Sequence, residues 1–340
     1  MFRYPAFRVC FTLKTYPLLV SIIIPAYNAA GTIKRTIASA LAQDYTDIEL
    51  ILVDNNSSDD TLKVMEAAAL AHPEKIKVTN CPIQGCSAAR NWGIKLSQGE
   101  WLQFLDADDT LEPGKLNTQI TAVIGNTGWV ISPYRILFPD GHTLLNTPAE
   151  DIWKGLVYQY RTGYTCSNLY HRKSLATVGN WEEALPDNTD PNLHFELLKA
   201  GIPFLVVPAV ETNYYQHDTP GRVSTRSPVA GNQRRIDMIV EVNQFLQNDK
   251  PAYWKENSPY FRAALLSTIR ILATHDLPLA ANNYAKHFQA ADLSSLFGQP
   301  IISKHFLRAY QLLGFRTTEW LRLRTTQALP PSLKSWLKAT

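Results

Sequence analysis

Three aspartates, Asp106, Asp108 and Asp109, crowd into four consecutive positions of the stretch FLDADDTLEP, directly after an apolar run. Two carboxylates about 4 Å apart repel each other by about 4 kcal/mol at an effective dielectric constant of 20, so such a cluster needs a positive charge nearby. Hard divalent cations prefer carboxylate and phosphate oxygens as ligands. We therefore expect Asp106 and Asp108 to hold a Mn²⁺ or Mg²⁺ ion together with a diphosphate. The alternative is an acidic helix entry, and for Asp109 we expect that role, as a helix cap.

Other polar residues stand where ligands would meet the backbone. Asp54 follows the apolar run ELILV, so its carboxylate is placed to accept a hydrogen bond from a nucleobase N–H, or else to form an Asx turn in its own loop. Arg90 follows GCSAA on the first turns of an expected helix, where Gly85 lets the backbone approach a ligand closely. Its guanidinium suits ribose or phosphate oxygens, and a plain surface arginine is the alternative.

These residues need a scaffold that brings strand ends together. Apolar runs typical of buried strands alternate with helical repeats of apolar residues along the first third of the chain. The alternation predicts an α/β fold with a doubly wound, mostly parallel sheet that binds ligands at the carboxyl ends of its strands. Strands are expected at 18–28, from 48, at 76–80 and at 101–106, and helices at 31–43, 61–72, 87–97 and from about Pro113.

The pattern changes further along the chain. Residues 128–230 are irregular, with one clear helix at 191–201 that ends in Gly201, a residue suited to a left-handed cap. Residues 231–340 are typical of helices separated by prolines, so we expect a sheet domain over 1–230 and a helical region over 231–340. The first region has 19 Lys and Arg residues and 23 Asp and Glu residues, whereas the second has 14 Lys and Arg residues and 7 Asp and Glu residues. The two regions therefore differ in the sign of their charge.

Composition narrows the class of protein. A chain of 340 residues with 45% hydrophobic and 19% charged residues is typical of globular proteins, and a net charge of +3 does not argue for nucleic acid. The four cysteines, Cys10, Cys81, Cys86 and Cys166, show neither a zinc pattern nor a disulfide framework. The N-terminus lacks the order of a signal peptide, and no run of 18 apolar residues occurs. We therefore expect reduced thiols and a cytoplasmic location.

Four segments resemble, in order and rough spacing, those of the inverting family-2 glycosyltransferases with the GT-A fold. SIIIPAYN is similar to the first strand and nucleotide loop of that family, and LVDNNSSDDT to its V-D-D-G-S-x-D-x-T segment. GCSAARNWGI resembles G-x-x-x-A-R-N-x-G, and FLDADD resembles the D-x-D metal motif. The resemblance covers about residues 20–225. Neither a P-loop nor a dinucleotide fingerprint is present, because the first strand ends in PAYN instead of glycines.

The resemblance implies a role for particular residues. Asp54 would bind the nucleobase, Asp106 would lie near the ribose and metal-bound water, and Asp108 would coordinate the ion directly. His217 is a possible third metal ligand or an ordinary histidine, and Arg222 could meet phosphate when a loop closes. The expected nucleotide-sugar-binding residues are Pro25, Ala26, Tyr27, Asn28, Asp54, Gly85, Arg90, Asp106 and Ala107. Tyr27 would stack on the base, or else be a tyrosine at the edge of the core.

Inverting transfer also needs a base that takes the proton of the acceptor hydroxyl. In the segment VGNWEEALPDNTDPNLHFELLKAG, Asp190 falls where the resemblance places that base. The alternatives are a structural cap, because Asp before Pro191 suits a helix N-terminus, and Asp187 as the base. Thr189 stands where the family usually has Glu.

Asn55 and Asn56 stand where the family usually has Asp and Gly. The loss of the second carboxylate leaves the choice of nucleobase open. Asn tolerates the left-handed backbone better than other non-glycine residues, so we expect the turn at Asn56 to survive.

We therefore expect a metal-dependent inverting glycosyltransferase that moves a sugar from a nucleotide donor, UDP-linked by preference, to a hydroxyl of a cell-surface glycan or lipid-linked acceptor. The alternatives are a catalytically inactive GT-A-fold scaffold or subunit, and a sugar nucleotidyltransferase, for which PAYNAAGTIKR is a poor triphosphate loop. In the last 36 residues, basic side chains and Trp320 and Trp336 alternate with leucines. They would either lie on the inner face of an anionic membrane or pack on the catalytic domain or a second subunit.

Overall fold

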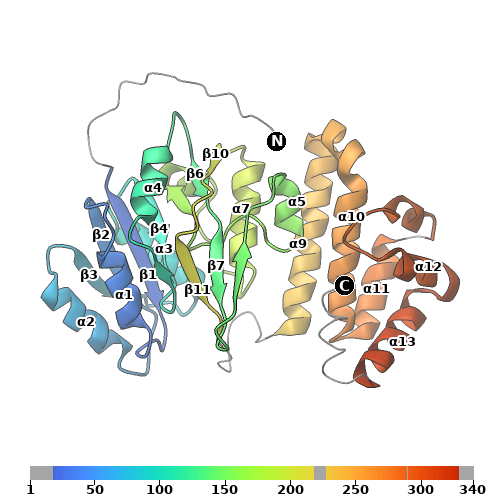
Figure 1. Cartoon of the computed structure of the whole chain (residues 1–340), viewed down its shortest axis with the longest axis horizontal. Coiled ribbons are helices and arrows are strands. Elements are labelled where there is room, and N and C mark those ends of the chain that lie inside the picture. The colour runs from blue at the N-terminus through green and yellow to red at the C-terminus, as the bar shows by residue number, and fades with distance from the viewer. Residues whose placement is uncertain (1–17, 218–226, 289, 329–340) are drawn as a thin grey trace.

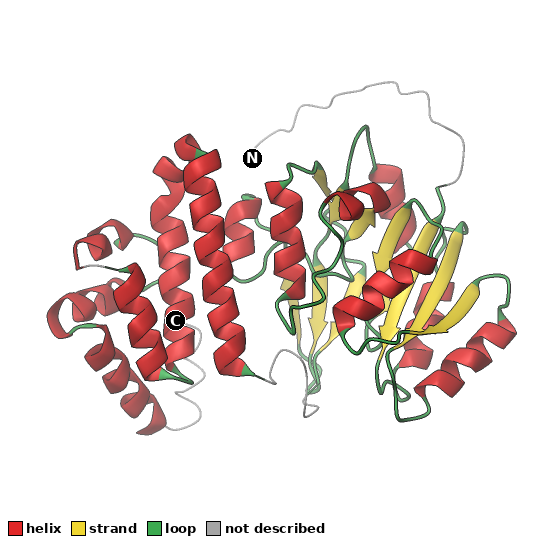
Figure 2. Cartoon of the chain, turned by 180° about the vertical axis from the view of Figure 1, so that it is seen from behind, coloured by secondary structure: helices red, strands yellow, loops and turns green. Residues whose placement is uncertain are grey.

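The protein combines an α/β half and a helical half, which lie side by side in the computed structural model (Figure 1). The structure describes residues 18–217, 227–288 and 290–328. Strands are confined to one half and the long C-terminal helices to the other (Figure 2). The expected α/β fold with a mostly parallel sheet and a helical C-terminal region is confirmed. Arg222 and Trp336 lie outside the described residues.

The main sheet has seven strands in the order β10-β6-β9-β4-β1-β2-β3. All neighbouring pairs are parallel except those of β9, which runs antiparallel to both β4 and β6. The strands are β1 (Val20–Ala26), β2 (Ile48–Asp54), β3 (Ile76–Asn80), β4 (Trp101–Phe104), β6 (Trp129–Ile131), β9 (Leu169–His171) and β10 (Phe204–Val206). A second sheet has the order β5-β11-β7-β8 and consists of β5 (Thr110–Leu111), β7 (Tyr134–Leu137), β8 (Thr143–Asn146) and β11 (Thr212–Tyr215).

The central strands are buried on both faces, as expected for parallel strands covered by helices. Side chains alternate along β1, so Ile23 belongs to one hydrophobic cluster while Ile22 and Ile24 belong to the other. The helices of this half are α1 (Ile33–Leu41), α2 (Thr61–Ala71), α3 (Cys86–Leu96), α4 (Lys115–Ala122), α5 (Ile152–Val157), α6 (Arg172–Thr177) and α7 (Thr189–Lys199). Helix α1 buries Ile33, Thr36, Ile37 and Ala40, the spacing of one helical face.

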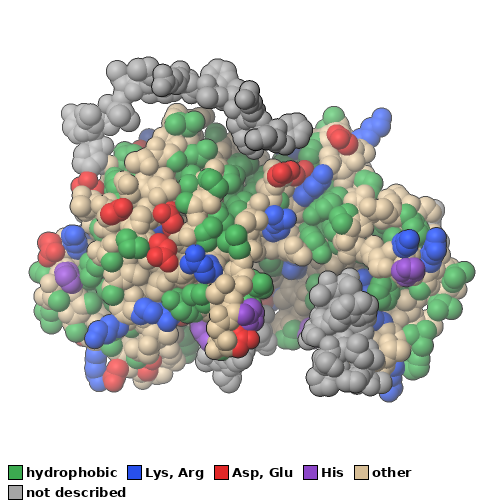
Figure 3. Space-filling model, in the orientation of Figure 1, with side chains coloured by type: hydrophobic (Ala, Val, Ile, Leu, Met, Phe, Trp, Pro, Cys, Tyr) green, Lys and Arg blue, Asp and Glu red, His purple; other side chains and the backbone are tan. Residues whose placement is uncertain are grey.

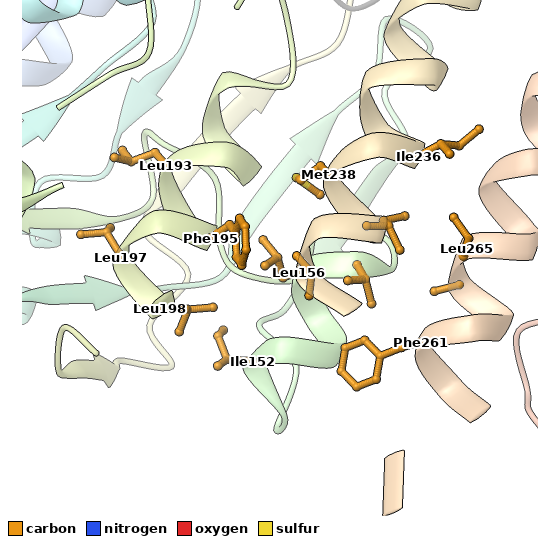
Figure 4. Close-up of a cluster of buried hydrophobic side chains, with 14 of the residues drawn as sticks. Ile152, Leu156, Leu193, Phe195, Leu197, Leu198, Ile236, Met238, Phe261 and Leu265 are labelled. Carbon is orange, nitrogen blue, oxygen red and sulfur yellow. The ribbon is translucent and has the colours of Figure 1, made fainter. Parts of the chain in front are cut away.

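The helical half shares a hydrophobic core with the α/β half. Its elements are α9 (Pro228–Asp249), α10 (Pro251–Ala273), α11 (Leu277–His287), the 3₁₀ helix η1 (Ala290–Leu296), α12 (Lys304–Leu313) and α13 (Phe315–Ala328). Figure 4 shows Leu156 of α5, Phe195 of α7 and Phe261 of α10 in one cluster of buried side chains. Helices α9 and α10 therefore pack on the α/β half and help to hold α7 in place.

Charge is distributed unevenly over the surface. On the face shown in Figure 3, most Asp and Glu side chains lie over the α/β half, whereas the helical half shows mainly Lys and Arg. No helix in the described parts of the chain combines the length and hydropathy that crossing a membrane requires. Among the described cysteines, Cys81, Cys86 and Cys166 are free thiols.

One local expectation is corrected. The helix expected from about Pro113 is present and begins at Lys115, with Gly114 at its N-cap position. Asp109 does not cap it, because the short strand β5 intervenes and the Asp109 side chain is fully buried. Two other expectations are confirmed: Gly201 has a φ of +66° and Asn56 a φ of +64°, both in the left-handed region.

Candidate functional site

The carboxyl ends of β1, β2 and β4 bring the expected donor-site residues to one edge of the sheet. In the pairing register, Ala26 lies beside Asp54, and Asp54 lies beside Asn80. The loop after β1 is tied to the loop after β2, because Asn28 Oδ1 accepts a hydrogen bond of 2.8 Å from the Ser58 backbone N–H. Pro25 and Ala26 are buried in β1, and Ala107 is buried behind Asp106. The tyrosine next to them, Tyr27, is 53% exposed and so is not part of the core.

Asp54 uses its two carboxylate oxygens differently. Oδ2 accepts a hydrogen bond of 3.2 Å from the backbone N–H of Ser57, so the Asx-type turn is present. Oδ1 is buried and has no hydrogen-bond partner among the described residues. A buried oxygen without a partner costs about 1–3 kcal/mol, so a ligand N–H that reached it would be favoured. The turn and a base-binding role are therefore compatible.

Asn55 holds the loop that precedes α3. Its Nδ2 donates to the Ile83 carbonyl oxygen over 2.7 Å, and its Oδ1 accepts from the Gly85 backbone N–H over 2.8 Å. Gly85 has a φ of +146°, which side-chain-bearing residues rarely adopt. An aspartate at position 55 could not donate to Ile83, so the departure from the family pattern has a structural reason.

Arg90 is buried at the centre of the site, with its side chain only 4% exposed, so the surface-arginine alternative is wrong. One terminal nitrogen, Nη2, lies 2.9 Å from Asp106 Oδ1, and the other, Nη1, lies 3.2 Å from Asp190 Oδ1. The guanidinium also lies over the Trp181 ring, 4.3 Å from its centroid. The two terminal nitrogens therefore contact two different carboxylates, one just after β4 and the other in α7.

Asp106 has two further partners that sequence reasoning missed. The Tyr164 hydroxyl donates to Asp106 Oδ2, and the Asp106 backbone N–H donates to Cys166 Sγ over 3.2 Å. Both residues lie in the stretch before β9, in the region where the sequence shows no readable spacing. The ring of Tyr164 in turn contacts the rings of Tyr134 and Tyr214.

Asp108 and His217 are neighbours in space although far apart in the sequence. Asp108 Oδ2 lies 2.7 Å from His217 Nε2, and both side chains are about one-third exposed. Two ligands at right angles around an ion with bonds of about 2.1 Å are about 3.0 Å apart, so this pair fits one Mg²⁺- or Mn²⁺-sized ion. Arg35 supports the loop by donating to the Asp108 carbonyl oxygen over 2.6 Å.

A second acidic group lies deeper. Ligand atoms of Asp106, Asp109 and Cys166 lie within 4.8 Å of one another. Asp109 accepts a hydrogen bond of 3.0 Å from the Tyr215 N–H, and burial, with repulsion from the neighbouring aspartates, raises its pKa well above the ordinary value. Hard cations disfavour a buried thiol, so the donor set of Asp108 and His217 is the better match.

Asp190 lies in the first turn of α7. The N-cap position belongs to Asn188, so the reading of Asp190 as the cap is wrong. Asp190 Oδ1 contacts Arg90 and, at 3.4 Å, the Thr189 hydroxyl, whereas Oδ2 accepts no hydrogen bond from the described residues. Asp187, the alternative base, forms a two-point ion pair with Arg234 of α9. Of the two carboxylates, Asp190 is the one that joins the cluster of Arg90 and Asp106.

Comparison with known proteins agrees with this geometry. Residues 21–176 match the family model "Glycosyl transferase family 2". The chain is 44% identical over 215 residues to an uncharacterized glycosyltransferase of Rickettsia typhi, and the match covers 60% of this chain and 63% of that protein. It spans from 32% to 63% of the length of the Rickettsia relatives that it matches.

Solved structures share the fold at low sequence identity. S. aureus TarS 1–349 in complex with UDP-GlcNAc superposes with a TM-score of 0.59 at 16% identity, covering 91% of this chain and 92% of that one. The mannosyltransferase PcManGT from Pyrobaculum calidifontis, in complex with GDP-Man and Mn²⁺, gives a TM-score of 0.51 at 18% identity, covering 91% and 88%. The motifs, the GT-A fold and the family model agree, and the segment that matches glycosyl transferase family 2 is residues 21–176.

Proposed function

We propose that the protein is a metal-dependent inverting glycosyltransferase that moves one sugar from a UDP-linked donor to a hydroxyl of a cell-surface glycan or lipid-linked acceptor. One observation carries the proposal: Arg90 contacts both Asp106, at the expected donor edge of the sheet, and Asp190, at the start of α7. This arrangement supports a base close to the donor, because Asp190 Oδ2 accepts no hydrogen bond from the described residues. The binding of UDP-GlcNAc and GDP-Man by proteins of the same fold supports a nucleotide-sugar donor.

The donor would lie along the edge formed by β1, β2 and β4. Asp54 Oδ1 would accept from the base, and the exposed ring of Tyr27 would stack on it. Asp106 would face the ribose. The remaining contacts of the nucleotide sugar would come from Pro25, Ala26, Asn28, Gly85 and Ala107.

Asp108 and His217 would hold the divalent ion, with Asp106 near its bound water. When bound, the ion neutralises the charge that develops on the departing diphosphate. Without a cation the acidic residues of this loop would repel that diphosphate. The Mn²⁺ in the structure of PcManGT supports this choice of ion.

Asp190 would act as the general base. Its Oδ2 would take the proton of the acceptor hydroxyl while the oxygen attacks the anomeric carbon from the face opposite the leaving nucleotide. One oxygen of the carboxylate is held by Arg90, so the other is presented in a fixed direction. This geometry supports a single displacement and hence inversion at the anomeric carbon.

The experiment that tests the donor site is thermal stabilisation by UDP, GDP, dTDP and CDP, each with Mn²⁺ and again with a chelator. We expect a shift with one nucleotide that is lost on chelation and in Asp108→Ala and His217→Ala. Asp140→Ala is a matched control, because Asp140 is an exposed aspartate that pairs with His142 in the turn between β7 and β8. The absence of a shift with every nucleotide would contradict the proposal.

A second experiment separates an enzyme from a scaffold of the same fold. Asp190→Asn should keep nucleotide binding and lower sugar transfer by about 10²–10⁴-fold, leaving a residual rate, because the amide cannot accept a proton from the acceptor. Unchanged transfer would remove Asp190 from the mechanism. Unchanged biological function in the absence of transfer would favour the scaffold.

We also propose that residues 1–230 carry donor binding and catalysis and that the helical region, 231–340, brings the enzyme to the inner face of a membrane from the cytoplasm. Trp320 and Leu321 of α13 are 49% and 42% exposed, and Arg324 lies over the Trp320 ring. Basic and aromatic side chains on one helix suit an anionic interface. Sedimentation with anionic but not neutral vesicles, lost in Trp320→Ser, tests this contact.

A further inference from the structure

We propose that Arg90 is a positioning residue for the base, and that its main role is to fix Asp190 relative to Asp106 and not to bind the nucleotide. The inference rests on the proposed function, because it takes Asp190 as the base. It changes the role that the motif G-x-x-x-A-R-N-x-G suggests for its arginine. The contacts of Arg90 and of the adjacent Asn91 carry it.

Protein carboxylates engage both terminal nitrogens of the Arg90 guanidinium. It is sandwiched between two carboxylates and the Trp181 ring, with 4% of the side chain exposed. Its remaining nitrogen, Nε, is buried and has no hydrogen-bond partner among the described residues. With 4% of its side chain exposed, Arg90 offers little surface to a nucleotide phosphate while Asp106 and Asp190 stay in place.

The planar fork of arginine explains why this residue type occupies the position. Two terminal nitrogens at a fixed separation, each with its own N–H donors, hold two separate carboxylates, which the single ammonium of lysine cannot reproduce. The cation also offsets the repulsion that two nearby carboxylates would otherwise exert on each other. Asp190 therefore keeps a defined rotamer before any acceptor arrives.

Asn91, the residue after Arg90 in α3, holds Trp181, from which the chain leads to Asp190. Its side chain accepts from the Trp181 backbone N–H over 3.0 Å and donates to the Trp181 carbonyl oxygen over 2.8 Å. Its Nδ2 also lies 2.7 Å from Glu183 Oε1. Arg90 and Asn91 of α3 thus anchor the chain that leads from Trp181 to Asp190, so α3 organises the acceptor side of the site.

The test compares Arg90→Lys and Arg90→Gln with the native protein, using UDP binding in the presence of Mn²⁺ and turnover of the UDP-sugar that stabilises the protein best. Arg172→Lys is the matched control, because Arg172 is a partly buried arginine that bonds Gly99, Ile94 and Ser97 away from the site. We expect UDP affinity to change by less than about 3-fold and kcat to fall by about 100-fold, the size of effect that a displaced base produces. Arg172→Lys should change neither.

A double mutant shows whether Arg90 acts through Asp190. In the Asp190→Asn background, Arg90→Gln should lower turnover by less than about 3-fold further, because the base is already lost. A full 100-fold additional loss would overturn the proposal, and so would a loss of UDP affinity of 10-fold or more with kcat unchanged. If Asp190→Asn alone leaves turnover intact, the proposed base is wrong, which is a separate result.

A crystal structure of Arg90→Lys gives an answer that does not depend on turnover. The lysine ammonium should contact one of the two carboxylates, and Asp190 should leave the rotamer that it has in the native protein. An unchanged Asp190 rotamer would contradict the positioning role. Melting temperatures of all variants show whether a loss of activity reflects unfolding.

Discussion

Restoring the usual family residue at position 55 should destabilise this protein. In Asn55→Asp, the carboxylate cannot donate to the Ile83 carbonyl oxygen, which lies 2.7 Å from Asn55 Nδ2. Two acceptor oxygens would then face each other in a site where residue 55 is only 4% exposed. The hydrogen bond from the Gly85 N–H to Oδ1 would remain and would strengthen.

The magnitude follows from these contacts. Loss of the hydrogen bond to Ile83 lowers the free energy of unfolding by about 1 kcal/mol, and the acceptor left without a partner lowers it by about 1–3 kcal/mol. The stronger hydrogen bond from Gly85 offsets part of this loss. We expect a net loss of about 2 kcal/mol in the free energy of unfolding, which corresponds to a fall in Tm of about 4 °C. Lowering the pH toward 4 protonates the carboxyl and restores a donor, so the difference should narrow.

Urea unfolding of the native protein, Asn55→Asp and Asn56→Asp at pH 7.5 measures the effect. Asn56→Asp is the control, because it makes the same chemical change at the adjacent, exposed residue. It should change the free energy of unfolding by less than about 0.5 kcal/mol. If Asn55→Asp were as stable as Asn56→Asp, the loop contacts of Asn55 would not be the reason for its presence.

Two further predictions concern stability. Burial lowers the pKa of His194 to about 4, below the value of about 6.5 in the unfolded chain, so stability present above pH 6.5 is lost as the pH falls toward 4. Between pH 7 and pH 5 the native protein should lose about 2 kcal/mol more than His194→Gln, measured by urea unfolding; equal losses would refute the assignment. Gly93→Ala should cost about 1–2 kcal/mol, because its Cβ would lie 2.4 Å from Ile23 Cγ2 in a packed core. Gly31→Ala, which meets nothing within 4 Å, should cost much less, and similar losses for both glycines would contradict the packing argument.

The parts of the fold that depend on local patterns were predictable. The runs from 18 and 48 became β1 and β2, because continuous apolar sequence is what a strand buried on both faces requires. The shorter run from 76 became β3, a partly exposed strand at the edge of the sheet. Gly201 and Asn56 adopt the left-handed backbone for the steric reason that the sequence already indicates.

The contacts within the site were not predictable. Arg90 meets Asp190 from 100 positions away, and Tyr164 and Cys166 meet Asp106 from about 60, so no spacing in the sequence encodes these pairs. Asp109 illustrates the same difficulty. Its local sequence is compatible both with a helix cap, which we expected, and with a buried carboxyl beside β5, which the structure shows. Tertiary packing decides between them, and only the structure contains it.

The antiparallel strand β9 lies between β6 and β4 and so divides the main sheet into two parts with different proposed roles. On one side, β4, β1, β2 and β3 lead to the residues proposed to bind the donor. On the other side lie β6 and β10, and β10 follows helix α7, which contains Asp190. Because Arg90 is the proposed link between the two sides, loops beyond β9 could be exchanged or lengthened while the donor half stays intact. A family with such a division can acquire new acceptors through its second half and inherit its nucleotide chemistry through the first.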